Sequence, residues 1–489
     1  MNAPLRKVAI ALVALFVLLL VNANVVQVGE AKSLTSNSHN RRVLIDDYRR
    51  QRGDIIAGGQ AVALSTETND KLKYLRTYPG GSLFAPLTGY YSLTLGETGI
   101  EKSENGVLSG NDSRLSISFD RLSQLLSGRT LRGGNVTLTI DRAAQQIAAK
   151  ALGNRRGAVV ALDPRTGAVL AMVTSPSYDP GLLTGHDSAT IGKNYQTLLK
   201  APGNPLLNRA TQQSYPPGST FKVIVTAAAL STGNYTAQTQ VPSPDTIVLP
   251  GTTKTLSNFA GESCGGPTST LLHALEISCN TAYAKLGLAL GADRLRSMAE
   301  AFGFDSTVDD VGVPVAASKF PDSDHINLPQ TALSAIGQYD VRATPLQMAM
   351  VAAAIGNGGT LMQPYVVAQE QGPDLKVLSK TEPKKLGQPI TGTVANELTQ
   401  MMVGVVDQGT GTAARISGVS VAGKTGTADT GVPGAKPDSW FISFAPAANP
   451  TVAIAVLVEN GGGEVNTTGG AVAAPIAKQV MEQLLKDAR

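Results

Sequence analysis

The stretch Tyr215-Pro216-Pro217-Gly218-Ser219-Thr220-Phe221-Lys222-Val223 carries the most information about this chain. Two prolines do not fit inside a helix and an apolar run follows them, so a helix is predicted to begin at Ser219. Ser219 and Lys222 then share one face of that helix. A serine becomes a nucleophile when a base removes its proton, and a lysine in a dry cleft can be that base. The backbone N–H groups at the start of the helix could stabilise a developing oxyanion. The alternative is a helix-capping serine followed by a surface lysine.

Two further motifs follow in the chain. Ser278-Cys279-Asn280 precedes a helix predicted to start at Thr281, and Lys424-Thr425-Gly426 follows the strand-like residues 419–422. Ser-x-x-Lys and Lys-[Ser/Thr]-Gly each occur once, whereas Ser-x-Asn also occurs at three places before residue 112. The order of the three motifs, with spacings of 59 and 146 residues, is the signature of penicillin-recognising serine acyl-enzymes.

A competing motif overlaps the third one. Residues 418–425 read Gly-Val-Ser-Val-Ala-Gly-Lys-Thr and match the phosphate-binding pattern G-x-x-x-x-G-K-[ST]. That loop must open a helix, and residues 426–434, with three glycines and a proline, do not form one. A nucleoside triphosphatase is therefore disfavoured, and no bound nucleotide is expected.

Composition excludes several other classes. A net charge of +4 with 16% charged residues is too balanced for a nucleic-acid binder, and 42% hydrophobic residues are too many for a disordered chain. The four histidines and two cysteines include no H-E-x-x-H segment and no histidine in a recognisable Ser-His-Asp context. We therefore expect no metal site and no cofactor.

The N-terminus predicts the compartment. Arg6 and Lys7 precede an apolar run at residues 8–26, which would make about 28 Å of helix and nearly match the hydrocarbon core of a membrane. Positive charge in front of the run predicts a cytoplasmic tail at 1–7, a single-pass anchor at 8–26 in the plasma membrane, and an extracytoplasmic remainder. The alternative is a cleaved signal peptide, because Val21-Asn22-Ala23 has a spacing that signal peptidase accepts.

The 489 residues suffice for about three folding units. The polar residues 27–44 predict a juxtamembrane spacer, and the short strands and glycine turns of 45–130 predict a small α+β, β-rich membrane-proximal domain. Further on, strand-like runs lie at 136–141, 157–162, 168–173, 419–422, 440–445 and 452–458, and helical runs lie at 143–152, 219–232, 268–303, 342–357 and 474–485. The runs at 157–162 and 168–173 flank a Pro/Gly turn at 163–167 and predict a hairpin. Residues 136–489 are therefore predicted to form a large α+β domain whose antiparallel sheet comes from both ends of the segment.

Cys264 and Cys279 lie 15 residues apart in the part of the chain predicted to be exported. In an oxidising compartment these cysteines are able to form a disulfide, which would constrain the loop beside Ser278. The alternative is two unpaired thiols that are partly buried.

At the three motifs the chain resembles the class B penicillin-binding proteins, and more narrowly the actinobacterial PbpA type with a short membrane-proximal domain. The resemblance covers nearly the whole chain and includes residues 52–55, 78–79, 98–101, 138–141, 208–210, 336–338, 343–349 and 474–476. One departure is Gly337-Gln338-Tyr339, where the family usually has a second glycine. No stretch resembles a glycosyltransferase, which argues against a bifunctional class A enzyme.

The resemblance implies a transpeptidase fold at 136–489, with an antiparallel sheet flanked by helices and an all-helical subdomain. It implies a dimerisation or pedestal-like role for 45–130. The implied activity is that of a D,D-transpeptidase, which cross-links peptidoglycan stem peptides through an acyl-enzyme on Ser219 and is blocked covalently by β-lactams.

The family's catalytic roles fall on five residues of this chain. Ser219 would be the nucleophile and Lys222 its base. Ser278 and Lys424 would form a proton-relay and electrostatic pair, and Asn280 would hold the donor amide.

The family's binding roles fall on the third motif. Thr425, Gly426 and Thr427 would bind the terminal carboxylate of the substrate or that of a β-lactam. The backbone N–H groups of Ser219 and Thr427 would form the oxyanion hole.

The implied partners are stem peptides and their lipid-linked precursor, β-lactam antibiotics, the membrane, a glycosyltransferase and proteins of the division or elongation machinery, with an effect on cell shape. No nucleic acid is expected. The alternatives are an anchored β-lactamase, which would have to hydrolyse its acyl-enzyme, a D,D-carboxypeptidase, and a scaffold of the division machinery acting mainly through 45–130. A β-lactam sensor should carry more membrane segments.

Overall fold

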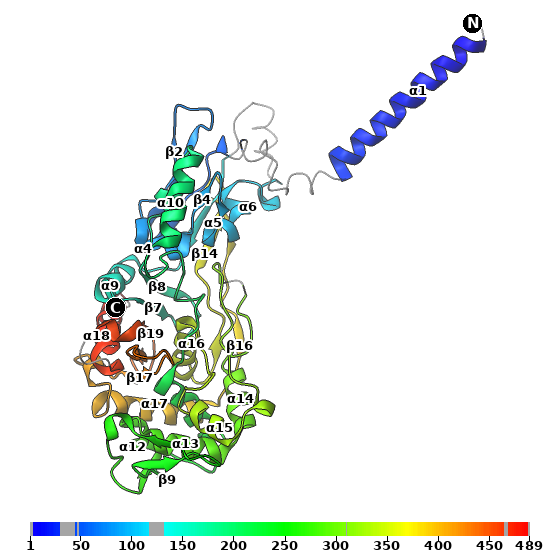
Figure 1. The fold of residues 1–489 in the computed structure, drawn as a ribbon. Helices are drawn as coiled ribbons and strands as arrows, with labels where there is room; N and C mark the ends of the chain where they lie inside the picture. The colour runs from blue at the N-terminus through cyan, green and yellow to red at the C-terminus, as the bar shows by residue number, and fades with distance from the viewer. Residues whose placement is uncertain are drawn as a thin grey trace.

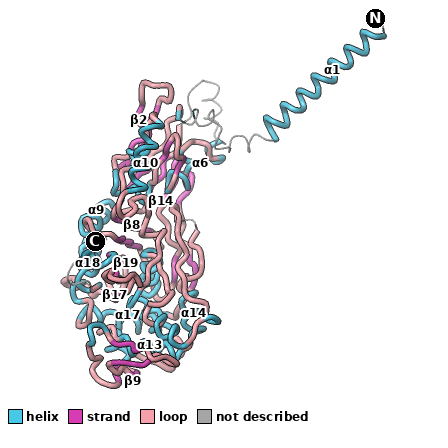
Figure 2. The backbone as a smooth tube through the Cα atoms, in the orientation of Figure 1, coloured by secondary structure: helices cyan, strands magenta, loops and turns pink. Residues whose placement is uncertain are grey.

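Figure 1 shows a computed structural model of the chain, and Figure 2 shows the same view coloured by secondary structure. The structure describes residues 3–29, 45, 48–116, 132–309, 311–463 and 468–487. The predicted spacer at 27–44 lies outside the described residues from residue 30 onward.

The N-terminal helix is long and apolar. Helix α1 (Ala3–Asn24) continues into a π-helical turn at Val25–Gly29. Within the described part of the chain, the 24 residues Pro4–Gln27 form the one helix that is long and apolar enough to cross a membrane. The segment 8–26, predicted as the anchor, lies within it.

A six-stranded sheet forms the upper part of the molecule in Figure 1. Its strands, in spatial order, are β15 (Val377–Lys380), β14 (Val367–Gln371), β6 (Asn135–Leu138), β1 (Ile55–Ala57), β2 (Gln60–Glu67) and β3 (Tyr74–Thr77). Strand β1 pairs with β6 in parallel and with β2 antiparallel. Three of the strands therefore come from before residue 130 and three from after it, so the sheet joins two parts that are far apart in sequence.

Short elements complete this part. They are α4 (Gly81–Thr88), α5 (Gly99–Ser103), α6 (Asn105–Leu108), α7 (Ser113–Ser116), and the two-stranded ladder of β4 (Tyr91–Ser92) and β5 (Gly96–Glu97). The carboxylate of Glu101, fully buried, accepts hydrogen bonds from Arg52 at 2.6 Å, from Arg76 at 2.6 Å and from Tyr78 at 3.0 Å. The buried carboxylate is paired with two arginines, and its partners come from different elements. The cluster therefore holds the start of β1, β3 and α5 together.

A five-stranded antiparallel sheet forms the centre of the large domain. Its order is β17 (Ala422–Ala428), β18 (Asp438–Ala445), β19 (Val452–Val458), β7 (Gly157–Leu162) and β8 (Val169–Ser175). All seven residues of β19 are buried, as expected for a central strand covered on both faces. Helices α9 (Arg142–Leu152) and α18 (Gly469–Asp487) cover one face, and α16 (Pro345–Gly356) covers the other. The predicted antiparallel sheet, built from both ends of the segment, is confirmed.

The remaining helices gather at the end of the large domain opposite the six-stranded sheet (Figure 1). They are α11 (Lys222–Leu230), α12 (Leu271–Glu276), α13 (Asn280–Leu290), α14 (Ala292–Ala301), α15 (Leu328–Ser334) and α17 (Gly392–Asp407). Helix α10 (Ser188–Lys200) instead packs against the turn at Pro180–Leu183. Small ladders join β9 (Gln240–Pro242) to β12 (Thr268–Thr270), β10 (Thr246–Val248) to β11 (Thr255–Ser257), and β13 (Leu361–Met362) to β16 (Lys385–Gly387). Short 3-10 turns lie at Pro180–Leu183, Gly218–Phe221, Phe259–Gly261, Ser323–His325, Thr412–Ala414 and Glu459–Gly463.

Several predicted element boundaries are wrong. The helical run expected at 268–303 begins with β12 and is interrupted at Ser278, whose φ of +64° cannot belong to a right-handed helix. The helix expected from Thr281 begins one residue earlier. The strand expected at 419–422 begins only at Ala422 and continues to Ala428, because its ladder with β18 extends through the Lys-Thr-Gly motif. The last helix begins at Gly469 rather than residue 474.

Candidate active site

Ser219 lies on a tight turn at the start of α11. The predicted helix start is a 3-10 turn, Gly218–Phe221, which leads directly into α11 at Lys222. Gly218 has a φ of +53°, and a Cβ atom there would lie 2.9 Å from the carbonyl oxygen of Thr427. A glycine is therefore required for the turn to rest against β17. Ser219 is half-buried and lines the adjoining cleft.

The turn is fixed from behind by the residues that precede it. Tyr215 and Ala343 exchange two backbone hydrogen bonds, at 2.9 and 2.8 Å. The indole N–H of the buried Trp440 donates to the carbonyl oxygen of Pro216 at 3.0 Å, and the rings of Tyr215 and Trp440 pack edge to face. Trp440 is therefore a core residue that supports the nucleophile turn.

Glu459 is a buried carboxylate that sequence analysis did not single out. Its Oε1 atom accepts from the hydroxyl of Tyr215 at 2.8 Å and from Nε of Arg209 at 2.7 Å. Its Oε2 atom lies 2.7 Å from a guanidinium nitrogen of Arg156. A single glutamate between a strand and a run of glycines belongs to no recognisable motif. That Glu459 binds Tyr215 and two arginines could therefore be found only from the fold.

Lys222 is fully buried and faces the second motif. Its Nζ donates to the carbonyl oxygen of Ser278 at 2.6 Å and to Oδ1 of Asn280 at 2.8 Å, and lies 3.3 Å from Oγ of Ser278. Burial, followed by the nearby charge of Lys424, lowers the pKa of Lys222 well below its usual range. A lysine with a lowered pKa is able to accept a proton at neutral pH.

Lys424 approaches the same hydroxyl group from the sheet. It lies on β17, is fully buried, and its Nζ is 2.9 Å from Oγ of Ser278 and 3.0 Å from the carbonyl oxygen of Thr425. Burial lowers the pKa of Lys424 to about 7. The hydroxyl of Ser278 therefore lies between two lysine amines, which is the geometry of a proton relay.

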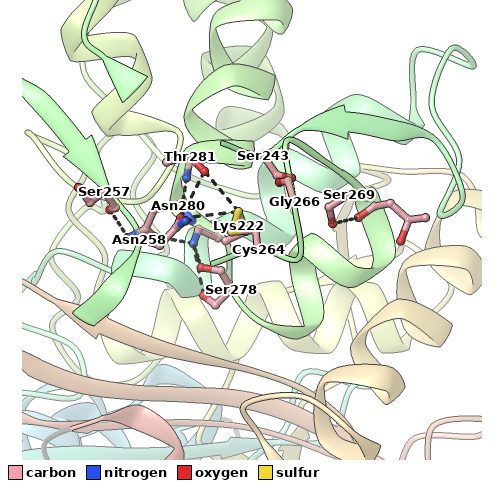
Figure 3. Close-up of a disulfide and its surroundings, with 12 residues drawn as sticks. Lys222, Ser243, Ser257, Asn258, Cys264, Gly266, Ser269, Ser278, Asn280 and Thr281 are labelled. Carbon is pink, nitrogen blue, oxygen red and sulfur yellow. Dashed lines mark hydrogen bonds between the residues drawn. A yellow bond between two sulfur atoms is a disulfide. The ribbon is translucent and has the colours of Figure 1, made fainter. Parts of the chain in front are cut away.

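The second motif is held by a loop that closes onto it (Figure 3). Oδ1 of Asn258 accepts from the backbone N–H groups of Asn280 at 2.9 Å and Thr281 at 3.1 Å. A disulfide joins Cys264 to Cys279. We call residues 258–264 the cleft loop.

The three motifs and the cleft loop line one cleft of about 640 Å³. Its lining residues are Ser219, Asn258, Phe259, Glu262, Ser263, Cys264, Gly265, His273, Ile277, Ser278, Cys279, Asn280, Thr410, Thr425, Thr427, Thr468, Gly469 and Gly470. Asn258, Phe259, Glu262, Ser263, Thr410 and residues 468–470 also line it but were not found from the sequence, because no motif marks them.

Strand β17 forms the wall of the cleft opposite the second motif. The hydroxyl groups of Thr425 and Thr410 lie 2.6 Å apart. At Gly426 a Cβ atom would lie 2.9 Å from the side chain of Thr220, so the glycine lets the strand approach the nucleophile turn.

In the described part of the chain no group of three or more His, Cys, Asp or Glu side chains is placed to hold a metal ion.

Two family models match the chain. Residues 157–482 match the penicillin binding protein transpeptidase domain, and residues 52–136 match the penicillin binding protein A dimerisation domain. The first match covers more than half of the chain and contains all three motifs.

Curated relatives match over the full length. The peptidoglycan D,D-transpeptidase PbpA of Mycolicibacterium smegmatis is 47% identical over 495 residues, which cover 100% of both chains. The protein of the same name from Mycobacterium tuberculosis is 46% identical over 499 residues, which cover 99% of both.

Solved structures agree with these matches. The penicillin G acyl-enzyme complex of penicillin-binding protein A from M. tuberculosis superposes with a TM-score of 0.84 at 45% identity, covering 89% of this chain and 100% of that one. The imipenem acyl-enzyme complex gives a TM-score of 0.84 at 45% identity, covering 90% and 100%.

Proposed function

The chain belongs to the penicillin-binding protein transpeptidase family, and from this we propose which role each cleft residue has in the reaction. The enzyme is a peptidoglycan D,D-transpeptidase that works through a serine acyl-enzyme and is acylated by β-lactams. The roles below are assigned to the residues of this chain from their contacts.

In the first half-reaction, Ser219 Oγ attacks the carbonyl carbon of the penultimate D-alanine of a stem peptide. Lys222 takes the serine proton, which its buried amine is able to do because its pKa is lowered. The backbone N–H groups of Ser219 and Thr427 receive the oxyanion, and the terminal D-alanine leaves. The approach of Gly218 to Thr427 supports this pairing, since it brings the two N–H groups to one edge of β17.

The remaining cleft residues hold the donor and move its protons. The charge on Lys424 attracts the terminal carboxylate, which Thr425, Gly426 and Thr427 bind along β17. Ser278 passes the proton to the departing amine, and its place between two lysine amines, at 3.3 and 2.9 Å, supports this step. Asn280 holds the donor amide.

In the second half-reaction, an amine of a neighbouring stem peptide attacks the acyl carbon and frees Ser219. A water molecule in place of the amine would give carboxypeptidase or β-lactamase chemistry instead. The cleft must therefore favour the amine over water.

The observation that best supports this assignment is that Lys222 and Lys424 meet at the hydroxyl of Ser278, in the cleft that Ser219 also lines. The test is covalent labelling of the full-length protein in detergent by a fluorescent penicillin. Ser219→Ala should abolish labelling, whereas Ser231→Ala, at an exposed position after α11, should label like the parent. Labelling that survives in Ser219→Ala would refute the nucleophile, and an acyl-enzyme that disappears within minutes in mass spectrometry would indicate a β-lactamase.

We propose that α1 anchors the chain with its N-terminus in the cytoplasm and its catalytic domain outside. The charges of Arg6 and Lys7 support this orientation. In spheroplasts of an otherwise unchanged strain, a membrane-impermeant maleimide should label Ser231→Cys directly and Lys7→Cys only after lysis. The reverse pattern would overturn the topology.

We also propose that the enzyme works beside a separate glycosyltransferase in cell division or elongation and so affects cell shape. The match of residues 52–136 to a dimerisation domain supports a contact with another protein on this part of the chain. Crosslinking in membranes from an introduced photoreactive residue on the exposed face of β2 should capture such an enzyme. Capture of division or elongation proteins alone would reject the pairing.

A further inference from the structure

The cleft loop is attached at both ends to the wall that carries the second motif. At one end the side chain of Asn258 binds two backbone N–H groups of α13, and at the other Cys264 is bonded to Cys279. Figure 3 shows both attachments beside Lys222 and Ser278. A side chain on this loop is therefore held at a fixed place relative to the relay residues.

Glu262 lies in this loop and contributes to the lining of the cleft. It is the only carboxylate among the described residues of that lining. Its side chain is exposed and has no ion pair or hydrogen bond within the described part of the chain. The neighbouring Glu276, in contrast, is buried and engaged by Gln408 at 3.0 Å and by His273 at 3.5 Å.

The positive charge in the cleft disfavours the approach of a cationic amine in the second half-reaction. Lys222 and Lys424 lie buried behind the relay hydroxyl, and each added positive charge there is unfavourable, as their lowered pKa values indicate. An aliphatic amine is mostly a cation at neutral pH, so the charge that the reaction requires on Lys424 opposes its entry. A carboxylate at the cleft edge offsets that repulsion and concentrates the amine near the acyl carbon.

We propose that Glu262 is the acceptor-binding carboxylate, which holds the ammonium group of the incoming amine and so sets the ratio of transfer to hydrolysis. This inference rests on the proposed function. The ammonium first loses one proton to water. The amine nitrogen then bonds to the acyl carbon, the bond between that carbon and Ser219 Oγ breaks, and the second proton passes from nitrogen to Oγ through the relay residues.

The test measures how the acyl-enzyme divides between two products. The full-length protein in detergent is acylated with an N-acyl-D-alanyl thioester, and the ratio of aminolysis to hydrolysis is measured by chromatography. Two nucleophiles are compared: glycinamide, which is mostly a cation at pH 7, and hydroxylamine, which is mostly uncharged. In Glu262→Gln the ratio with glycinamide should fall at least fivefold, and the ratio with hydroxylamine should change less than twofold.

Matched variants separate charge from structure. Glu262→Asp should recover part of the glycinamide ratio. Glu67→Gln, at the exposed end of β2 and far in sequence from the cleft, should leave both ratios unchanged. An unchanged glycinamide ratio in Glu262→Gln, or an equal loss with both nucleophiles, would overturn the proposal. Failure of the proposed function would look different, because the parent protein would then form no acyl-enzyme from the thioester.

Discussion

The hydroxyl of Tyr215 lies 2.8 Å from Oε1 of Glu459, and this bond ties the nucleophile turn to the end of β19. The same carboxylate binds Arg209 and Arg156. The position of Ser219 therefore depends on an ionic cluster whose side chains are not among the residues that line the cleft.

Removing this one hydroxyl should slow acylation without weakening binding. In Tyr215→Phe the two arginines still pair with Glu459, and the loss of one hydrogen bond costs about 1 kcal/mol of stability. We expect the acylation rate constant for a fluorescent penicillin to fall about fivefold, with the apparent dissociation constant within twofold. Tyr235→Phe, at a half-buried tyrosine, is the control. A change in binding with an unaltered rate constant would show that Tyr215 does not position the nucleophile.

The acylation rate should depend on pH through Lys424. The reaction requires Lys222 uncharged and Lys424 charged, and the pKa of Lys424 is lowered to about 7 by burial. The second-order rate constant for penicillin acylation should therefore fall as the pH rises through about 7. In Lys424→Arg the charge persists at all of these pH values, so this descending limb should disappear even if the overall rate drops. If the arginine variant keeps the limb, another group causes it.

Asp438 should make the protein less stable at neutral pH than in acid. Burial, opposed by the N–H of Asn460 and reinforced by the charge of Glu459, raises its pKa to about 6 from an ordinary 3.8. Because the folded state disfavours the charged form, the free energy of unfolding is highest below the ordinary value and falls as the pH rises through 6. Asp438→Asn keeps the acceptor and loses the charge. It should raise the free energy of unfolding by about 1–3 kcal/mol at pH 7.5 and much less at pH 4. Thermal unfolding at both pH values measures this, and a gain independent of pH would contradict the assignment.

Glu101 should be essential to the upper sheet. Replacing it by glutamine leaves Arg52 and Arg76 buried with an uncharged partner, which typically costs about 3–5 kcal/mol. Calorimetry of Glu101→Gln should show a clearly lower melting temperature, whereas Glu67→Gln should melt like the parent. Equal melting temperatures for parent and Glu101→Gln would mean that the cluster contributes little.

The catalytic motifs could be found from the sequence because each is local. Pro217 and the apolar run after Ser219 mark a helix start, and helical spacing then puts Lys222 one turn away. Strand β19 was equally visible, because it is a continuous apolar run. The structure joins Cys264 to Cys279, the pair for which free thiols were the alternative.

What the sequence did not reveal depends on long-range contacts. Glu459 has its role only because Arg209, 250 residues earlier, lies beside it. The start of β17 was misjudged because the residues before Ala422 are apolar, whereas the ladder with β18 decides where pairing begins. Tyr339 adopts a φ of +59°, which explains why glycine is usual there in the family, but one sequence alone does not show a backbone conformation.

The six-stranded sheet takes its strands from two separate parts of the chain, and this restricts how the chain can be divided into fragments. A fragment that starts at residue 136 would lack β1, β2 and β3, and would leave β6 as a bare edge open to aggregation. A fragment that ends at residue 130 would lack the partners that β1 needs on its other side. The part before residue 130 and the catalytic part therefore share one sheet, so neither is expected to fold when it is expressed without the other.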